Sequence, residues 1–285
     1  MEYKEKINIY LNNFIGEKKI IQDIFEGGKR IRPIICYLVF NCFFKKKYSE
    51  KKIINLSIFP EILHNMSLIL DDLPCMDNDN FRRGKESIHY KYGVHSALIL
   101  SFHLLEKYLK SLKEVINLEK KISIDNQEIL LIDYVNNILS TSCNELIEGQ
   151  YLDLNILPFA LDEKKIIKIN TFKTVPLFRI SFVLGYILIS QIEEDYIFKQ
   201  VIIDDLNSIA YSFGLIFQIS DDYLDTEKDK NDKVFLNFFL ILGKKRTLEI
   251  YNFHLNKCIN LLKKNNLYSK HFKEILNLLN KRIYE

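Results

Sequence analysis

The chain has 285 residues, 48% of them hydrophobic and 27% charged, a globular composition that excludes a disordered tail and a small disulfide-bonded scaffold. Its 40 Lys and Arg residues nearly balance 37 Asp and Glu residues and are spread along the chain, so nucleic-acid binding is not indicated. With 9 Gly and 5 Pro, the chain has few turn positions for a β-sandwich or barrel, which favours long helices.

Apolar residues at helical spacing predict a first long helix over residues 53–70, which runs directly into Asp71 and Asp72. The same periodicity predicts a helix over 97–116. After the polar break NLEKKISIDNQE it predicts another, roughly over 126–150. The first half of the chain is therefore expected to be helical.

The second half continues this pattern. Asp162 is expected to be the N-cap of a helix, which Pro176 should kink or break. Residues 201–224 predict a long, mostly buried helix, and 244–285 predict two amphipathic helices. Because no boundary rich in Pro, Gly or Ser divides the chain, we predict one all-α domain, a helical bundle over residues 1–285.

Two acidic clusters follow apolar helices: DDLPCMDND at 71–79 and DDYLD at 221–225. One acidic run alone is most often a solvated helix end, but two runs that both follow apolar helices are harder to explain in this way. Carboxylates at a helix C-terminus repel one another and face the negative end of the helix dipole. A cation is therefore expected near them.

The spacing within each cluster indicates which carboxylates can act together. Asp221 and Asp225 are neighbours on one helix face. Pro74 should end the first helix and let the carboxylate of Asp77 swing back toward Asp71. Such sparse carboxylate ligation suits Mg²⁺, which takes its other ligands from water and substrate phosphates.

Basic residues precede or follow the first acidic cluster, in GGKRIRP at 27–33 and RRG at 82–84. Arginine forks match phosphate oxygens in a bidentate way, and glycines allow close approach of the backbone. Together, the acidic and basic clusters suggest two phosphorylated groups in one cavity, one held through metal and one through Lys and Arg.

Cysteine usage and the N-terminal residues bear on location. Five cysteines without a CxxC pair indicate neither a disulfide framework nor a zinc site, and a reducing cytoplasm fits them best. A plastid-type organelle is the alternative if a transit peptide has been removed. The start, MEYKEKINIY, has no apolar signal region, and no stretch approaches the ~18 uncharged apolar residues of a membrane span.

The motifs GGKRIRP, HNMSLILDDLPCMDNDNFRRGK, EGQYLDL, FKT and GLIFQISDDYLD occur in this order between residues 27 and 225. In this combination the sequence resembles the trans-isoprenyl (polyprenyl) diphosphate synthases, in their short-chain farnesyl and geranylgeranyl branch. The resemblance implies an all-α bundle of the isoprenoid synthase type around a deep central cavity, usually in a homodimer. It also implies condensation of isopentenyl diphosphate with an allylic diphosphate (dimethylallyl, geranyl or farnesyl).

The resemblance further implies a role for each matching residue. Three Mg²⁺ ions would be held by carboxylates, with Asp71, Asp77 and Asp221 as ligands and Asp72, Asp222 and Asp225 in support. The allylic diphosphate would also meet Arg82 and Lys173. Isopentenyl diphosphate would bind without metal to Lys29, Arg32, His64 and Arg83. Thr174 and Gln218 would line the place where the allylic cation forms, and the catalytic set would be Asp71, Asp72, Asp77, Lys173, Thr174, Gln218 and Asp221.

The sequence also departs from the family pattern. Leu70 stands where the family usually has His, and Leu100-Ser101-Phe102 replaces the usual small-Gly-Asp run. The loop after the second acidic cluster is shortened to TEKDKNDK, which leaves the third diphosphate-binding lysine open among Lys228, Lys230 and Lys233. These departures motivate an alternative, a catalytically impaired partner subunit of a heteromeric synthase. A terpene cyclase would carry a different metal motif where DDYLD stands.

Product length is predicted from the helix that ends at Asp71. The growing chain should run along this helix, so Met66 and Ser67, about one turn earlier, are expected to form the floor of the cavity. Because Met is flexible and Ser is small, we expect geranylgeranyl diphosphate (C20), with farnesyl diphosphate (C15) close behind.

Overall fold

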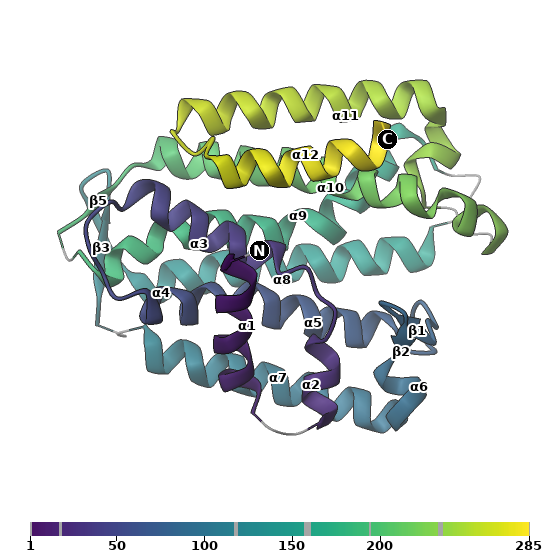
Figure 1. Cartoon of the computed structure of the whole chain (residues 1–285), viewed down its shortest axis with the longest axis horizontal. Coiled ribbons are helices and arrows are strands. Elements are labelled where there is room, and N and C mark those ends of the chain that lie inside the picture. Colours follow the sequence, from purple (N-terminus) through teal and green to yellow (C-terminus); the bar gives the residue numbers. More distant parts are fainter. Residues whose placement is uncertain are drawn as a thin grey trace.

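The computed structural model describes residues 2–16, 19–116, 119–156, 161–193, 195–232 and 236–284. Helices dominate this part of the chain, as predicted (Figure 1). In chain order they are α1 (Glu2–Ile15), α2 (Lys19–Phe25), α3 (Ile31–Phe43), α4 (Glu50–Ser57), α5 (Phe59–Asp71), α6 (Ile88–Tyr92), α7 (Val94–Val115), α8 (Leu131–Asn155), α9 (Glu163–Ile187), α10 (Gln200–Asp232), α11 (Phe238–Lys264) and α12 (Lys270–Tyr284). The short elements are β1 (Phe81–Arg82), β2 (Lys85–Glu86), β3 (Lys121–Ile124), β4 (Gln127–Leu130), β5 (Ile197–Phe198) and the 3₁₀ turn η2 (Leu188–Gln191).

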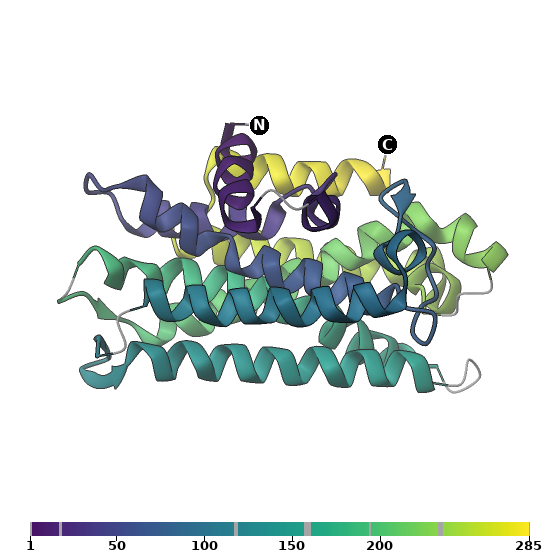
Figure 2. The same cartoon turned by 90° about the horizontal axis from the view of Figure 1, so that it is seen from below.

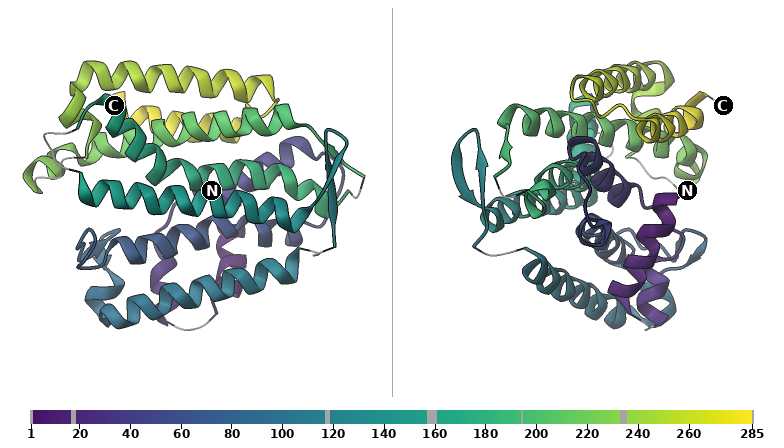
Figure 3. Two further views of the ribbon diagram at one scale, coloured as in Figure 1. Left: turned by 180° about the vertical axis from the view of Figure 1, so that it is seen from behind. Right: turned by 60° about the vertical axis from the view of Figure 1, so that its left-hand side comes forward.

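The core of the bundle is built around α9. This helix packs against α3, α8 and α10, while α10 also packs against α11 and α12, and α5 packs against α7. The long helices run roughly alongside one another in Figures 1 and 3. Figure 2 shows α7 and α8 on the outer side opposite α1 and α12. Because all residues from Thr174 to Ile187 except Arg179 are buried, α9 is the central helix, and the all-α prediction is confirmed.

The effects of two prolines on the helices differ from what the sequence predicted. The predicted helix over 53–70 is broken at Ile58 into α4 and α5, because Pro60 lies in the first turn of α5, where a residue without an amide hydrogen is tolerated. The break expected at Pro176 is wrong, since α9 continues through this residue. Pro176 is buried together with the residues on both sides of it, and this packing holds the helix together despite one missing hydrogen bond.

The predicted polar break before α8 contains a hairpin that the sequence reading missed. Strands β3 and β4 pair antiparallel, and β5 joins β3 in parallel. The turn at Asp125 and Asn126 has φ values of 46° and 68°, a left-handed conformation that Asx residues tolerate in two-residue hairpins. The helix expected from residue 126 therefore begins only at Leu131 and extends to Asn155.

Helix α10 is longer than predicted, and this changes the setting of the second acidic cluster. The expected helix over 201–224 continues to Asp232, so the cluster does not lie at a helix end and the expected loop after it is helical. Asn237 fixes the next segment to this extension by donating to the Asp222 carbonyl at 2.9 Å and to Asp229 Oδ2 at 2.8 Å. The same side chain accepts from the amide of Phe239 at 2.9 Å and so caps α11.

Other predicted boundaries are confirmed. Asp162 caps α9 by accepting a hydrogen bond from the Lys165 amide at 2.8 Å. The helix expected over 97–116 is α7, and the two amphipathic helices near the end of the chain are α11 and α12. The separation predicted between them lies at residues 265–269.

Two described helical stretches are long and apolar enough to cross a membrane by length and composition alone, Glu50–Asp71 and Glu163–Gln191. Their most apolar windows are 67% and 83% buried inside the bundle, respectively. Core helices of a bundle are expected to be buried to this extent. The length and apolar composition of these two stretches therefore do not support a membrane span.

A carboxylate on α2 provides a test of stability against pH. Asp23 accepts hydrogen bonds from Lys91 Nζ and the Tyr92 hydroxyl, both at 2.7 Å, and pairs with Lys19 at 3.0 Å. Burial alone would raise the pKa of Asp23, but these three partners hold it well below its ordinary value. The stabilisation is therefore present above the unfolded-state pKa of about 4 and is lost as pH falls through the folded-state value.

We expect Asp23→Asn to lower the melting temperature by about 2–4 °C at neutral pH and by progressively less below pH 4. Circular dichroism melts of both proteins at several pH values measure this difference. An equal difference at neutral and strongly acidic pH would contradict the assignment of this stabilisation to the ionised carboxylate.

Candidate active site

A cavity of about 520 Å³ lies between α3, α5, α9 and α10. Most of the residues predicted to form the site line it: Lys29, Arg32, His64, Ser67, Asp71, Asp77, Arg82, Arg83, Lys173, Thr174, Gln218, Asp221 and Asp225. The structure thus brings together side chains from segments that lie up to two hundred residues apart. Three predicted residues are not among those that line the cavity: Met66, Asp72 and Asp222.

The first carboxylate pair is formed where α5 ends. Asp71 is the last residue of α5, and the turn that follows returns so that the Asp77 amide donates to the Asp71 carbonyl at 2.9 Å. Asp77 also accepts from Gln150 Nε2 at 3.1 Å. Burial raises the pKa of Asp71 to about 7, opposed by the charge of Lys173 and assisted by that of Asp77. The return of Asp77 toward Asp71 agrees with the turn predicted at Pro74.

The second carboxylate pair lies within α10. Asp221 and Asp225 line the same cavity from successive turns of this helix. Asp221 forms an ion pair with Arg282 from α12. Burial raises the pKa of Asp221, and the charges of Arg282 and Lys29 partly offset this rise. Sequence reasoning missed Arg282, because an arginine near the end of an amphipathic helix carries no motif.

The two carboxylates expected to support metal binding have other partners. Asp72 is 4% exposed and accepts from Arg82 Nε at 2.8 Å. Asp222 accepts from the Phe238 amide and from Gln218 Nε2, both at 2.8 Å, and burial raises its pKa to about 7. Both side chains therefore orient neighbours that line the cavity rather than lining it themselves.

Polar groups of α9 and α10 meet on one wall of the cavity. Lys173 forms an ion pair with Asp153 of α8. The Thr174 hydroxyl donates to Gln218 Oε1 at 2.8 Å, so Gln218 bridges Thr174 and Asp222. These contacts fix the orientation of the Thr174 and Gln218 side chains at the cavity surface.

Arg32 and His64 form the basic side of the cavity. Arg32 is 9% exposed, and its Nε has no hydrogen-bond partner among the described residues. Burial lowers its pKa to about 10, so it remains charged at neutral pH. Burial and the surrounding guanidinium groups lower the pKa of His64 well below its ordinary value, so its imidazole is neutral. An unpartnered buried donor of this kind suits an anionic ligand.

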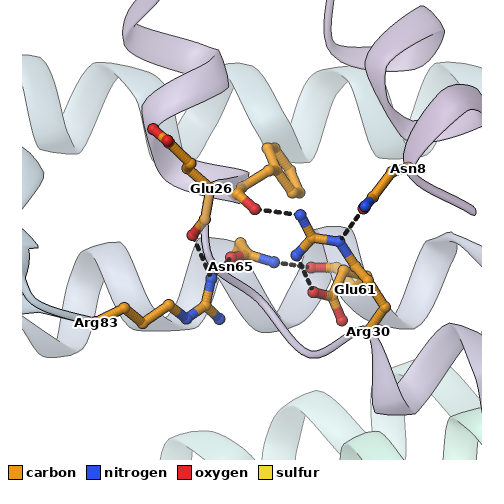
Figure 4. A network of polar contacts seen from close by, with 7 residues as sticks. Asn8, Glu26, Arg30, Glu61, Asn65 and Arg83 are labelled. Atoms are coloured by element: carbon orange, nitrogen blue, oxygen red, sulfur yellow. Dashed lines mark hydrogen bonds and ion pairs between the residues drawn. The ribbon is translucent and has the colours of Figure 1, made fainter. Parts of the chain in front are cut away.

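A polar network centred on the buried side chains of Arg30, Glu61 and Asn65 holds this side in place, and Arg30, Glu61 and Arg83 also line the cavity (Figure 4). Arg30, with a left-handed φ of 59°, donates to Glu61 Oε1 and Asn8 Oδ1, both at 2.8 Å. Asn65 donates to the Glu61 carbonyl at 2.7 Å and accepts from Arg83 at 3.3 Å. The network thereby links α1, the start of α3, α5 and the β1–β2 hairpin.

At two positions near the cavity, neighbouring atoms lie so close to the backbone that only glycine fits. A Cβ at Gly28 would lie 2.0 Å from Nη1 of Arg30, and a Cβ at Gly149 would lie 2.9 Å from the backbone nitrogen of Lys173. A side chain at Gly28 would displace the Arg30 guanidinium, and a side chain at Gly149 would collide with the backbone of α9 at Lys173. The glycines stand in the motifs GGKRIRP and EGQYLDL, but the sequence alone did not show which contacts they permit.

The residues that depart from the family pattern do not lie together in the structure. Phe102 is 71% exposed on α7, and Leu70 is partly buried against the core. Of the lysine candidates after the second acidic cluster, Lys230 is exposed in the last turn of α10. Lys233 and the side chain of Lys228 lie outside the described part of the chain.

The carboxylates fit Mg²⁺ that is shared with a substrate. Among the described residues, no group of three or more His, Cys, Asp or Glu side chains is placed to hold a metal by itself. Each acidic pair instead supplies a few oxygens beside a cavity with cationic walls. Mg²⁺ binds in this way when waters and substrate phosphates complete its shell.

Fold and site together define a class of protein: a helical bundle around a cavity that has carboxylates on one side and Lys, Arg and His on the other. The family model described as Polyprenyl synthetase matches residues 17–236. The chain therefore belongs to the polyprenyl synthetase family, in its short-chain trans-prenyl diphosphate synthase branch.

Relatives in sequence carry two product names. The farnesyl diphosphate synthase of Buchnera aphidicola from Acyrthosiphon pisum is 33% identical over 80% of this chain and 79% of its own length. The farnesyl diphosphate synthase of Bacillus subtilis is 32% identical over 74% of this chain and 66% of its own length. Geranylgeranyl pyrophosphate synthase 4 of Arabidopsis thaliana is 31% identical over 73% of this chain and 52% of its own length. These relatives support a short-chain prenyltransferase.

Solved structures show the isoprenoid synthase fold. A geranyltransferase from Helicobacter pylori has a TM-score of 0.80 and 24% identity, with coverage of 98% of this chain and 96% of that chain. A structure of geranyltransferase from Helicobacter pylori complexed with magnesium and isoprenyl diphosphate has a TM-score of 0.77 and 24% identity, with coverage of 99% and 95%. The fold expected from the sequence is confirmed.

Proposed function

We propose that this protein is a Mg²⁺-dependent prenyltransferase that condenses isopentenyl diphosphate with an allylic diphosphate and releases geranylgeranyl diphosphate. The observation that carries this proposal is the single cavity in which carboxylates of α5 and α10 face cations of α3, α9 and the β1–β2 hairpin. Opposed charge of this kind can hold two diphosphates at once, one through metal and one directly.

The allylic diphosphate belongs on the acidic side. Asp71, Asp77, Asp221 and Asp225 would hold Mg²⁺, of which we expect three ions when substrate is bound. When bound, the metal supplies positive charge that stabilises the departing pyrophosphate. Arg82 and Lys173 add fixed positive charge, and their partners Asp72 and Asp153 keep both side chains in place.

Isopentenyl diphosphate belongs on the basic side, where Lys29, Arg32, His64 and Arg83 line the cavity. Burial and the neighbouring guanidinium groups lower the pKa of His64, which favours a role as a hydrogen-bonding group. This diphosphate needs no metal, because the lining guanidinium and ammonium groups supply its counter-charge.

The reaction then proceeds between the two diphosphates. Cleavage of the allylic carbon–oxygen bond gives pyrophosphate and an allylic cation, which the isopentenyl double bond attacks to form the new carbon–carbon bond. The oxygens of Thr174 and Gln218, fixed by their mutual hydrogen bond, line the wall where this cation forms. The resulting cation loses a proton to the released pyrophosphate, which restores a double bond.

The length of the product depends on the side chains at the floor of the cavity. Ser67 lines the cavity, whereas Met66 is partly buried against the core and is not among the lining residues. A small side chain at Ser67 leaves room for the chain to extend. Farther along α9, Ile180 and Leu184 line a separate apolar pocket with Tyr108 of α7, so the surroundings remain apolar beyond the cavity. We therefore propose a C20 product, with C15 as the competing outcome.

We expect Ser67→Phe to shorten the main product by at least one isoprene unit, because the ring would fill the cavity where the growing chain extends. Ser67→Ala is the matched control, and its product should be that of the wild type. Chromatography of dephosphorylated products measures both. An unchanged product distribution in Ser67→Phe would rule out Ser67 as part of the floor.

We also propose that the protein is a homodimer. Large apolar side chains are exposed on two helices: Leu98, Ile99, Phe102 and Leu109 on α7, and Ile147, Tyr151 and Leu154 on α8. A group of exposed apolar side chains of this kind is typical of an interaction site. Light scattering should give about twice the chain mass, and Phe102→Asp should shift the protein toward the monomer. A wild-type monomer would contradict this assignment.

For location we propose the cytoplasm. The cysteines are free in the structure, which fits a reducing compartment, and relatives named farnesyl diphosphate synthase come from bacteria. The plastid alternative gains no support from these relatives.

The proposed function is tested by release of pyrophosphate. It should require isopentenyl diphosphate, an allylic diphosphate and Mg²⁺ together, and EDTA should abolish it. A folded protein that is inactive alone but restores or redirects a second synthase would instead be the partner subunit suggested by Leu70, Phe102 and the shortened segment after the second acidic cluster.

A further inference from the structure

Helix α12 places a buried cation on a carboxylate of the active site. The Arg282 guanidinium forms an ion pair with Asp221 Oδ1 and donates to Ser220 Oγ at 3.1 Å. Its side chain is 8% exposed, and its Cζ lies 5.8 Å from the centroid of the Phe217 ring. A buried arginine is retained where it is paired and packed, so the end of α12 is built to hold this cation against Asp221.

The corresponding carboxylate of the first pair has a different environment. The cations that act on Asp71 are Lys173 and Arg82, and these side chains are paired with Asp153 and Asp72 instead. Asp71 itself has no ion pair with a described residue within 4.0 Å. The two acidic pairs therefore differ: among the described residues, Asp221 has a cation in direct contact, whereas Asp71 has none.

We propose that Arg282 is a positioning residue that serves as the resident counter-ion of Asp221 and is exchanged for the divalent cation when metal and diphosphate bind. This inference rests on the proposed function, which makes Asp221 a metal ligand. Arg282 is not among the residues that line the cavity, so the inference adds a residue of α12 to the site. It also makes the order of metal binding depend on this helix.

Elementary electrostatics supplies the reason. The guanidinium contacts Asp221 Oδ1 and therefore competes with a divalent cation for this oxygen. A divalent cation on the same carboxylate would also be repelled by the guanidinium charge in surroundings where screening is weak. A bound diphosphate adds negative charge that attracts both cations, so metal enters the second pair readily only with substrate. Metal alone should load the first pair before the second.

Binding of Mn²⁺ alone to the substrate-free protein tests this exchange without reference to turnover. We expect Arg282→Gln to lower the dissociation constant of the weakest Mn²⁺ site about tenfold, because removing a like charge at this range favours the other cation. Lys281→Gln is the matched control, since it removes the same charge from the adjacent exposed position, and it should leave Mn²⁺ binding unchanged. Isothermal calorimetry and the electron paramagnetic resonance signal of free Mn²⁺ both measure this binding.

A double-mutant cycle with Asp221→Asn separates the exchange from a change in folding. The gain in Mn²⁺ affinity should disappear when Arg282→Gln is combined with Asp221→Asn. If Arg282→Gln does not fold, Ser220→Ala, which removes the second acceptor of Arg282 together with a hydrogen bond to the Phe217 carbonyl within the same helix, should give a smaller gain of the same sign.

Equal Mn²⁺ affinity in wild type and Arg282→Gln, or an equal gain in Lys281→Gln, would overturn the role of Arg282. Product formation by those same preparations would show that the proposed function stands without it. If the protein forms no product with any allylic primer but Arg282→Gln still tightens Mn²⁺ binding, the role of Arg282 stands and the proposed function fails.

Discussion

Asp71→Asn should lower kcat/KM by about a thousandfold or more, the scale seen when an electrostatic group is removed from a reacting centre. Asp71 ends α5 inside the cavity, beside Asp77 and Lys173. An amide has nearly the same shape but no negative charge, so it should bind Mg²⁺ far more weakly. Steady-state kinetics over a range of Mg²⁺ concentrations measure the loss, and high Mg²⁺ should restore only part of it.

Asp79→Asn is the matched control for this experiment. Asp79 belongs to the same acidic cluster and pairs with Arg82 at 3.3 Å, but it is not among the residues that line the cavity. Arg82 keeps its second partner, Asp72. We therefore expect less than a tenfold effect, and a loss equal to that of Asp71→Asn would mean that the cluster acts only through its total charge.

The largest effect on stability is expected from Glu61→Ala. Glu61 and Arg30 form an ion pair at 2.8 Å in which the side chains are 3% and 6% exposed, respectively. Removing the carboxylate leaves a buried guanidinium without its counter-charge, which costs about 3–5 kcal/mol. This is a large part of the free energy of unfolding of a typical protein. Denaturant unfolding followed by circular dichroism measures the change.

The double variant Arg30→Met/Glu61→Ala distinguishes the cost of the unpaired charge from the loss of packing. It should be more stable than Glu61→Ala alone, because no charge remains buried. If the double variant were less stable than the single one by the full effect of Arg30→Met, the two side chains would not be coupled and the network in Figure 4 would not act as a unit.

The sequence predicted those features of the fold and of the candidate site that are local in the chain. The turn at Pro74 that returns Asp77 to Asp71, and the N-cap at Asp162, both depend on residues only a few positions apart. The ordered motifs then identified which distant segments share a cavity. Spacing alone could relate Asp221 to Asp225, but not the second acidic pair to the first.

Tertiary contacts explain what the sequence did not predict. Pro176 remains inside α9 because its neighbours are buried on all sides. The extension of α10 is held by Asn237, which follows it in the chain. Arg282 reaches Asp221 only because α12 packs against α10. Each of these outcomes depends on a partner outside the local pattern, so helical periodicity and capping signals could not reveal them.

Product chain length tests the central proposal most directly. The purified protein is given isopentenyl diphosphate, Mg²⁺ and, in separate reactions, C5, C10 or C15 allylic diphosphates. We expect geranylgeranyl diphosphate from each primer, and no product in EDTA. A final C15 product would confirm the reaction but contradict the assignment of Ser67 as an open floor. The absence of any product from a folded dimer would contradict the assignment of an active synthase.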